Sequence, residues 1–288
     1  MSCQGVGSSL TNAMPILAQT VPIQYDTPYS PYAAKDWRAA FADVARQELT
    51  GVELAIAYPA EVDANAVLAE TGRYGLAIVT LSTGQICGLD GQFLTAADKD
   101  ARRRAAESLR GHIRLSAKLG RPHVTVGLLR GGFGEEAGTE ELLAEMLRPL
   151  CEMAENEGVR LQIEPINRTE TDLLHTTQAV LDFLHGLNMP KAIGLLFDSY
   201  HSDWEDPDLL SAARAALPVT SHVHFADRGR LLPGEGGIDF PALTAFLLGA
   251  GYAGAFALET RCLPSKAHVL AHYGKSFLQA TKTTGGRP

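Results

Sequence analysis

The sequence is poor in cysteine and has no long apolar run and no run of basic residues. Its four cysteines lie far apart without a C-x-x-C pair, so neither a zinc knuckle nor a disulfide framework is expected: Cys3, Cys87, Cys151 and Cys262. No apolar stretch is long enough to span a bilayer, and the N-terminus lacks the basic and apolar segments of a secretion signal. These absences predict a cytoplasmic protein without a membrane partner.

The chain also has no excess of positive charge. It carries 25 Lys and Arg against 33 Asp and Glu, a formal net charge of -8, which disfavours nucleic acid as a partner. With 45% hydrophobic residues among 288, it has ample apolar surface for one large core. Both ends lack a periodic apolar pattern, so we expect a flexible N-terminal segment at 1–15, one folded catalytic domain at 16–281 and a flexible tail at 282–288.

Short apolar runs alternate with amphipathic segments along the chain. Strands are expected at 16–23, 52–57, 76–81, 123–128, 160–164, 192–198, 221–225 and 255–259. Helices are expected at 36–49, 63–73, 96–119, 140–156, 176–187, 206–216, 240–248 and 265–280. Eight such units in about 250 residues predict an α/β fold, a single (β/α)8 TIM barrel. A doubly wound open sheet is the rival fold, but no G-x-G-x-x-G follows the first strand.

Four of the expected strands end in a polar residue that can bind a metal. Separations of 34, 26 and 35 residues place them on strands five to eight, at one mouth of the barrel: Glu164, Asp198, His224 and Glu259. Three clustered carboxylates repel one another unless a cation neutralises them, and oxygen-rich ligation with one nitrogen suits Mn2+, Mg2+ or Co2+. Each residue alone could instead be structural, for example through an ion pair with Arg168. Together, four such residues spaced one βα unit apart predict a metal site.

Further polar residues follow these strand ends on the expected loops. They could hold sugar hydroxyls and orient the ligands, or form surface ion pairs with Arg168 and one another: Glu170, His201, Asp227 and Arg230. Arg130, after the fourth strand, could reach the substrate or be an ordinary loop arginine.

The segments EPINRTE, FDSYH, HVHFADRGRLLPGEGGIDF and ALET carry these residues. In them the sequence resembles the xylose isomerase-like TIM barrel superfamily, particularly its ketose 3-epimerase and sugar phosphate isomerase/epimerase branch. The resemblance runs from about the third strand to the end of the barrel. It departs after Asp198, where Ser202-Asp203-Trp204-Glu205 replaces the asparagine and small aliphatic residue that epimerases often carry, so the resemblance does not specify the shape of the pocket or the substrate.

The resemblance implies that Glu164, Asp198, His224 and Glu259 are metal ligands. Glu164 and Glu259 would also be the acid/base groups, whereas His201, Glu170 and Arg230 would hold oxygens around the reacting carbons. It further implies a homo-oligomer, a dimer or a tetramer, that acts on a small-molecule sugar or sugar phosphate.

The proton beside a carbonyl is too weakly acidic for a carboxylate to remove unaided, so one divalent ion, Mn2+ first, is expected to stabilise the enediolate. Two glutamates on opposite faces of a cis-enediolate would invert the carbon, and proton transfer on one face would give the aldose instead.

The residues leave one other enzymatic function open and disfavour two further functions. A metal-dependent lyase or dehydratase of a keto-sugar, keto-inositol or keto-glycoside needs an acid for the leaving group, for which His201 or Asp203 could serve. A multi-zinc phosphodiesterase needs histidines from earlier strands, and the second and third strand ends, ELAIAYP and AIVTLSTG, have none. A non-catalytic binding protein would have lost a ligand, and none is lost.

Overall fold

The computed structural model describes residues 15–134, 138–189 and 191–282. The strands are β1 (Leu17–Pro22), β2 (Gly51–Ala55), β3 (Ala77–Ser82), β4 (His123–Val126), β5 (Leu161–Ile163), β6 (Ile193–Asp198), β7 (Thr220–Phe225) and β8 (Phe256–Leu258). The helices are α1 (Trp37–Arg46), α2 (Ala64–Tyr74), α3 (Gln85–Asp90), α4 (Lys99–Lys118), α5 (Glu140–Glu157), α6 (Thr177–Leu187), α7 (Ser199–Glu205), α8 (Leu209–Ala216), α9 (Phe240–Gly249) and α10 (Lys266–Ala280). Short 3-10 turns are η1 (Ala34–Asp36), η2 (Pro59–Glu61), η3 (Leu128–Arg130), η5 (Leu217–Val219) and η6 (Arg228–Arg230). The segments expected to be flexible, 1–15 and 282–288, lie outside the described residues except for Pro15 and Lys282.

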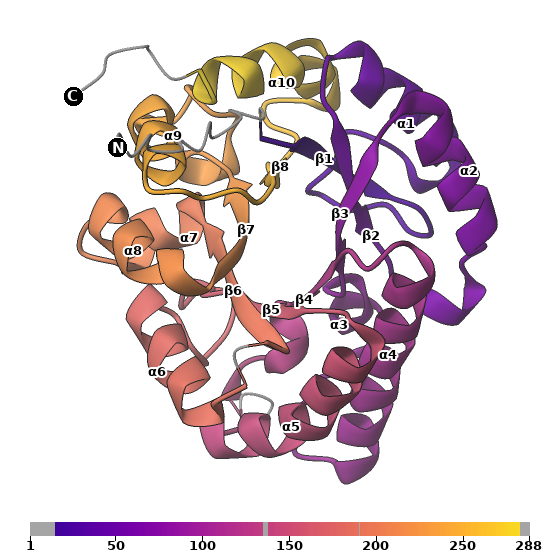
Figure 1. Ribbon diagram of the computed structural model, residues 1–288, viewed down its shortest axis with the longest axis vertical. Coiled ribbons are helices and arrows are strands. Elements are labelled where there is room, and N and C mark those ends of the chain that lie inside the picture. The colour runs from indigo at the N-terminus through magenta and orange to yellow at the C-terminus, as the bar shows by residue number, and fades with distance from the viewer. Residues whose placement is uncertain (1–14, 135–137, 190, 283–288) are drawn as a thin grey trace, which may run out of the picture.

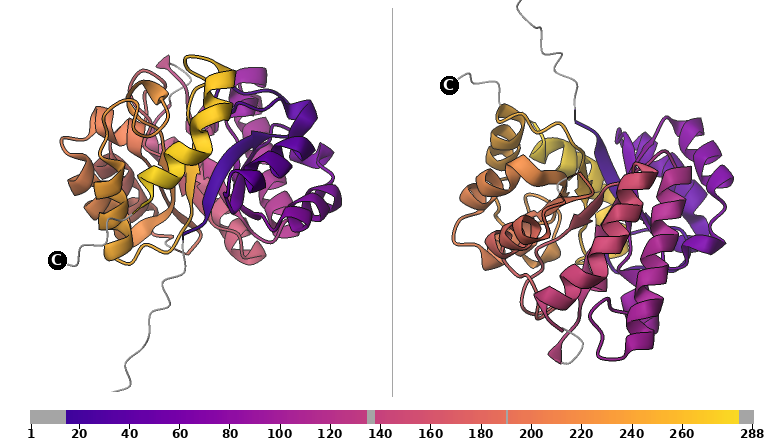
Figure 2. Two further views of the ribbon diagram at one scale, coloured as in Figure 1. Left: turned by 90° about the horizontal axis from the view of Figure 1, so that it is seen from above. Right: turned by 60° about the horizontal axis from the view of Figure 1, so that its bottom comes forward.

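The strands form one closed parallel barrel in sequence order, with helices around the outside (Figure 1). β1 pairs with β8 through Leu17 and Phe256, so the first and last parts of the barrel lie side by side (Figure 2). The structure confirms the predicted (β/α)8 barrel and excludes the doubly wound sheet, because a closed barrel has no switch point in its strand order.

Local chemistry places the helix ends. The side chain of Asp63 caps α2 by accepting from the backbone N–H groups of Asn65 and Ala66. Gly158 ends α5 in the left-handed conformation, with φ of 67°, which a residue with a Cβ rarely adopts. Such caps explain why the strand and helix positions follow the sequence pattern closely.

The expectation that His201 lies on a loop is wrong, because it lies in α7. Arg230 was also expected on a loop and lies at the end of the 3-10 turn η6. α7 has only seven residues and is capped at its start by Asp198, whose side chain accepts from the backbone N–H of Tyr200 and His201. A helix this short is too brief to show the apolar periodicity by which longer helices are recognised.

The core between barrel and helices is dense in aromatic rings around Phe225 of β7. The Phe225 ring centroid lies 4.8 Å from that of Phe240, 5.0 Å from Phe256 and 5.7 Å from Phe277. Phe225→Ala should lower the free energy of unfolding by about 3–5 kcal/mol, because it removes a buried ring and leaves a cavity. Urea unfolding measures this, with Phe133→Ala as control at a side chain that is 51% exposed. Equal stability losses in the two variants would contradict this account of the core.

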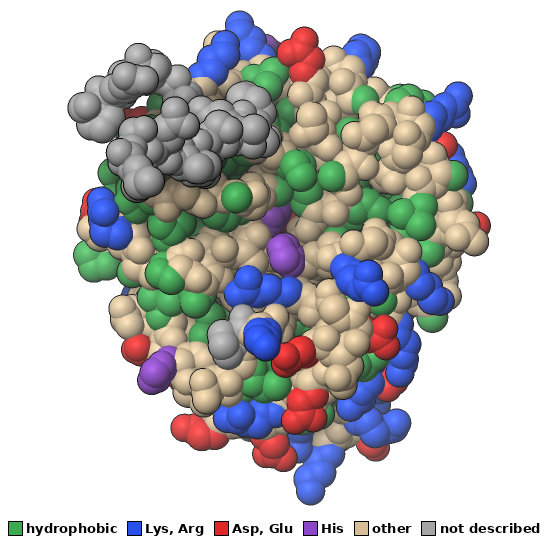
Figure 3. All heavy atoms as spheres, viewed as in Figure 1, with side chains coloured by type: hydrophobic (Ala, Val, Ile, Leu, Met, Phe, Trp, Pro, Cys, Tyr) green, Lys and Arg blue, Asp and Glu red, His purple; other side chains and the backbone are tan. Residues whose placement is uncertain are grey.

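None of the helices in the described ranges is long and apolar enough to cross a membrane. On the face drawn in Figure 3, acidic and basic side chains are interspersed around the lower rim, and histidine lies near the centre. That face therefore offers no broad surface of a single charge.

Candidate metal-binding active site

Four strand-end residues from β5 to β8 converge at the mouth of the barrel. One ligand atom from each of them lies within 4.8 Å of the others: Glu164, Asp198, His224 and Glu259. Nδ1 of His224 lies 3.7 Å from Oε1 of Glu164 and 3.7 Å from Oδ2 of Asp198. It lies 3.6 Å from Oε2 of Glu259. The structure thus brings together all four residues that the strand spacing singled out.

The donor atoms of this cluster fit a divalent metal ion. Oε1 of Glu164 and Nδ1 of His224 are buried and have no hydrogen-bond partner among the described residues. A buried polar atom left unpaired costs about 1–3 kcal/mol, so native proteins rarely leave two of them facing one point. Three carboxylate oxygens and one imidazole nitrogen form a donor set suited to Mn2+, Mg2+ or Co2+.

The electrostatics of the cluster also favour a bound cation. Burial raises the pKa of Glu164 to about 7, helped by the negative charges of Glu259 and Asp198 and opposed by His224. Burial alone would lower the pKa of His224, but the carboxylates of Glu53 and Glu259 raise it well above its ordinary value. The site thus holds more negative charge than its side chains neutralise, and it favours a bound cation or protons.

The position of Asp198 comes from its place at the junction of β6 and α7. Its Oδ1 accepts from the backbone N–H of Tyr200 at 2.7 Å and of His201 at 3.0 Å. Oδ2 is left to face the cluster. Burial alone would raise the pKa of Asp198, but the positive charge of Arg230 holds it well below its usual range. The carboxylate is therefore ionised and rigid.

Arg130 supports the backbone at Glu164. The Arg130 side chain is fully buried and donates to the backbone carbonyl of Glu164 and, at 3.3 Å, to that of Leu174. It is not among the residues that line the cavity at the mouth. On the other side, a Cβ on Gly127 would lie 3.3 Å from Oε2 of Glu164. The geometry therefore favours a supporting position for Arg130 over the substrate contact that the sequence left as one of two possibilities.

Arg230 crosses the mouth and ties the carboxylates together. Its Nη1 donates to Oε2 of Glu259 at 2.6 Å and to Oδ2 of Asp198 at 3.3 Å. Its Nη2 lies 2.7 Å from Nε2 of His201 and 3.8 Å from Oε1 of Glu170. The Arg230 backbone has φ of 61°, a conformation that costs a bulky residue energy and is typical of functional sites.

Asp227 shapes the loop that carries Arg230. Its Oδ1 accepts from the backbone N–H of Arg228 at 2.8 Å and of Ile238 at 2.9 Å, and its Oδ2 accepts from Gly234 at 2.8 Å. A Cβ on Gly236 would lie 2.6 Å from Oδ1 of Asp227, so this turn requires glycine. Asp227 was expected to bind substrate, but its oxygens hold the loop and it is not among the cavity-lining residues.

His201 and Glu170 flank Arg230. Nδ1 of His201 accepts from the backbone N–H of Asn167 at 3.1 Å, and burial with the charge of Arg230 lowers the pKa of His201 well below its ordinary value. Glu170 lines the cavity, where burial raises the pKa of its carboxyl group. His201 is therefore a neutral, buried neighbour of the ligands.

Two ion pairs decide between alternatives that the sequence left open. Arg168 pairs with Glu205 at 2.7 Å, so it does not neutralise a strand-end glutamate. Asp203 pairs with Arg228 at 2.7 Å and is not among the cavity-lining residues.

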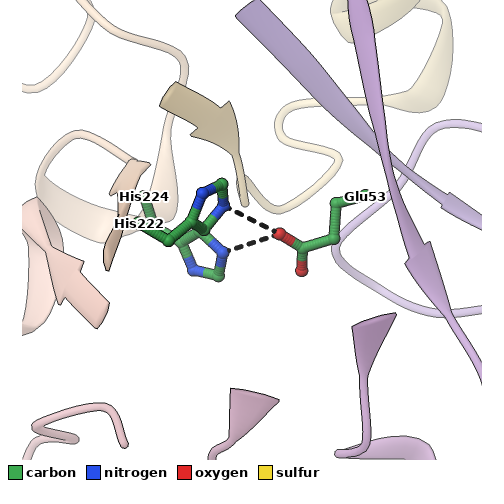
Figure 4. A group of neighbouring side chains, drawn as sticks. All are labelled: Glu53, His222 and His224. Carbon is green, nitrogen blue, oxygen red and sulfur yellow. Dashed lines mark hydrogen bonds and ion pairs between the residues drawn. The ribbon is translucent and has the colours of Figure 1, made fainter. Parts of the chain in front are cut away.

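Two residues near His224 were missed by the sequence analysis. Oε2 of Glu53, on β2, lies 2.8 Å from Nε2 of His224 and 3.3 Å from Nε2 of His222 (Figure 4). The sequence did contain two indications of this contact. Glu53 lies within an apolar strand, and the two histidines are two positions apart, which places them on the same face of their strand.

A cavity of about 300 Å3 opens beside the four ligand candidates. One wall has Glu164, Glu170, Arg230 and Glu259. The opposite wall comes from residues 25–29 after β1 and from 82–89 around α3, including Tyr29 and Leu89. The sequence analysis attached no role to this second wall.

Comparisons with known proteins agree with this geometry. Residues 41–279 match the family model described as xylose isomerase-like TIM barrel. The chain is 32% identical over 214 residues to the L-ribulose 3-epimerase of Mesorhizobium japonicum, covering 73% of this chain and 70% of that protein. It is 29% identical over 124 residues to the 3-dehydro-D-guloside 4-epimerase of Escherichia coli, which covers 43% of this chain and 47% of that protein.

Solved structures show the same fold. An L-ribulose 3-epimerase superposes with a TM-score of 0.76 at 24% identity, covering 93% of this chain and 95% of the other. A 3-keto-D-glucoside 4-epimerase from E. coli superposes with a TM-score of 0.75 at 18% identity, covering 93% and 99%. With the family match over most of the barrel, the chain belongs to the xylose isomerase-like TIM barrel superfamily, in the branch that contains the ketose 3-epimerases.

Proposed function

We propose that the protein is a divalent-metal-dependent sugar epimerase, ketose 3-epimerase-like, that acts on a free ketose. The observation that carries the proposal is the cluster itself: the unpaired, buried Oε1 of Glu164 and Nδ1 of His224 face the carboxylates of Asp198 and Glu259. The names of the similar proteins, L-ribulose 3-epimerase and 3-dehydro-D-guloside 4-epimerase, support a carbohydrate epimerase.

Glu164, Asp198, His224 and Glu259 would hold one divalent ion, Mn2+ before Mg2+ or Co2+, which when bound stabilises the negative charge of an enediolate. Glu164 and Glu259 would each carry out one of the two proton transfers. One removes the proton from the carbon beside the carbonyl, and the other returns a proton to the opposite face, which inverts that carbon.

Residues around the ligands would bind the sugar. Glu170 and Arg230 line the cavity and would contact hydroxyl oxygens, and His201 packs against Arg230 behind them. The opposite wall, with Tyr29 and Leu89, would cover the apolar face of the sugar and exclude water from the enediolate.

The charge of the cavity favours a free sugar over a sugar phosphate. Among the described residues that line it, Arg230 is the only cation, and Asp198 and Glu259 already engage its guanidinium. Asp26, Glu164, Glu170 and Glu259 contribute carboxyl groups to the same lining. A phosphate group would therefore meet like charge and no free cationic partner.

The test is a panel of free ketopentoses and ketohexoses and their phosphate esters, with the Mn2+-loaded protein. We expect epimers of one or more free ketoses, and kcat/KM for the matching ester at least about tenfold lower, since one unmatched charge costs over about 1.4 kcal/mol. Conversion of esters alone would contradict the free-sugar assignment.

Elimination gains no support from the site. Asp203, one of the two candidate acids for a leaving group, pairs with Arg228, and neither Asp203 nor the other candidate, His201, lines the cavity. The same assay detects elimination through the absorbance of an unsaturated ketone. We further propose that residues 16–281 form the single catalytic domain, and assembly into a dimer or tetramer stays a prediction.

A further inference from the structure

A buried carboxylate lies on the far side of His224 from the proposed metal. Glu53 projects from β2 into the barrel interior and is fully buried. In Figure 4 its carboxylate points to both His222 and His224 of β7. Its Oε2 lies 2.8 Å from Nε2 of His224, at good hydrogen-bond distance.

This contact determines which ring nitrogen of His224 carries the proton. An ionised carboxylate only accepts hydrogen bonds, so Nε2 of His224 must donate to Glu53. A neutral imidazole has one N–H, and its Nδ1 is then left with a free lone pair. That Nδ1 lies 3.6–3.7 Å from the carboxylate oxygens of Glu164, Asp198 and Glu259, where the ion would bind.

Without Glu53 the opposite tautomer would be favoured. The three carboxylates around Nδ1 attract an N–H at that nitrogen, and a proton there blocks metal binding. The carboxylate of Glu53 offsets this attraction from the other side of the ring.

His222 fixes the carboxylate of Glu53. It lies two positions before His224 on β7, so both side chains point to the same side of the strand. Its Nε2 lies 3.3 Å from the same Oε2, and the two rings stand at 84° with centroids 5.2 Å apart. Oε1 of Glu53 has no hydrogen-bond partner among the described residues, so both histidines share one oxygen.

We propose that Glu53 is a positioning residue that, steadied by His222, holds His224 in the Nε2–H tautomer and so presents Nδ1 to the metal ion. This role rests on the proposed metal-dependent function. It acts through His224, since Glu53 lies outside the cavity lining.

Metal affinity of purified, folded variants tests the role. Glu53→Leu removes the acceptor and should weaken binding of Mn2+ or Co2+, measured by competition with a chromophoric chelator, by about 10–100-fold. Glu53→Gln keeps an amide oxygen that accepts from Nε2, so it should restore most of the affinity, to within about tenfold of wild type. The visible spectrum of bound Co2+ should change in Glu53→Leu.

Thr80→Val is the matched control. Thr80 pairs with Glu53 in the β2–β3 register, but its hydroxyl group hydrogen-bonds to Thr125 and Gln162 and not to Glu53 or His224. The variant removes these bonds next to Glu53 while the Glu53–His224 contact stays, so it should leave metal affinity unchanged. Wild-type metal binding with equal affinity in Glu53→Leu would overturn the inference and leave the proposed function standing. A wild type that binds no metal would overturn both.

A second measurement needs no variant. In wild-type protein loaded with diamagnetic Mg2+ or Zn2+, nitrogen-15 NMR of the histidine rings should show His224 protonated at Nε2 and unprotonated at Nδ1. A His224 ring without a proton on Nε2 in the loaded protein would overturn the inference, even if every Glu53 variant failed to fold.

Discussion

Glu259→Gln should lower kcat/KM for the epimerised ketose by about 10²–10⁴-fold, the contribution typical of a positioned acid/base group. Glutamine keeps the size of the side chain and an oxygen that can reach the metal, but it cannot exchange a proton with the substrate carbon. The loss should therefore lie mainly in kcat. Steady-state kinetics with the preferred free ketose at saturating Mn2+ measure it.

Glu205→Gln is the matched control for this prediction. It makes the same chemical change at a carboxylate of α7 that pairs with Arg168 and is not among the residues lining the cavity. Its activity should stay within about threefold of wild type, since ion pairs with an exposed partner contribute little. A Glu259→Gln enzyme as active as Glu205→Gln would remove Glu259 from the mechanism.

Arg230→Met should cause a large loss of stability that depends on the metal ion. Arg230 is buried and donates to Asp198 and Glu259, and removing one partner of a buried ion pair costs about 3–5 kcal/mol. The loss should be greatest in chelator and smaller with saturating Mn2+, because a bound ion would neutralise the carboxylates that lose their partner. Urea unfolding under both conditions measures it.

Arg228→Met serves as the control two positions away. Arg228 is 58% exposed and pairs with Asp203, so its replacement should cost less than about 1 kcal/mol and show no dependence on Mn2+. If Mn2+ changed the stability loss of both variants equally, or of neither, the link between Arg230 and the metal cluster would fail.

The barrel and its ligand cluster followed from the sequence because both depend on spacing. Each βα unit returns the chain to the same end of the barrel, so polar residues one unit apart had to meet, as Glu164 and Asp198 do. No side-chain direction was needed for that inference.

The roles of the neighbouring residues depend on side-chain direction, which spacing does not contain. Arg130 lies beside the site in sequence, yet its guanidinium turns back to the carbonyls of Glu164 and Leu174. Asp227 turns toward the backbone of its own loop. Long or flexible side chains at a strand end can point into the cavity or away from it, and only the packed structure decides.

Glu53 was missed for a different reason. A glutamate in an apolar strand is costly to bury alone, but the sequence does not show which residue compensates it. Its partners, His222 and His224, come from a strand 169 and 171 residues later. The second cavity wall was missed because the segments 25–29 and 82–89 have no apolar periodicity.

The most direct test of the central claim is the NMR spectrum of the preferred free ketose incubated in D2O with protein that carries one Mn2+ per chain. The account predicts that the epimer forms with deuterium at the inverted carbon beside the carbonyl, that chelation stops the exchange, and that added Mn2+ restores it. An epimer without deuterium at that carbon, or exchange that continues in the metal-free protein, would contradict metal-assisted proton transfer to and from the substrate carbon by Glu164 and Glu259.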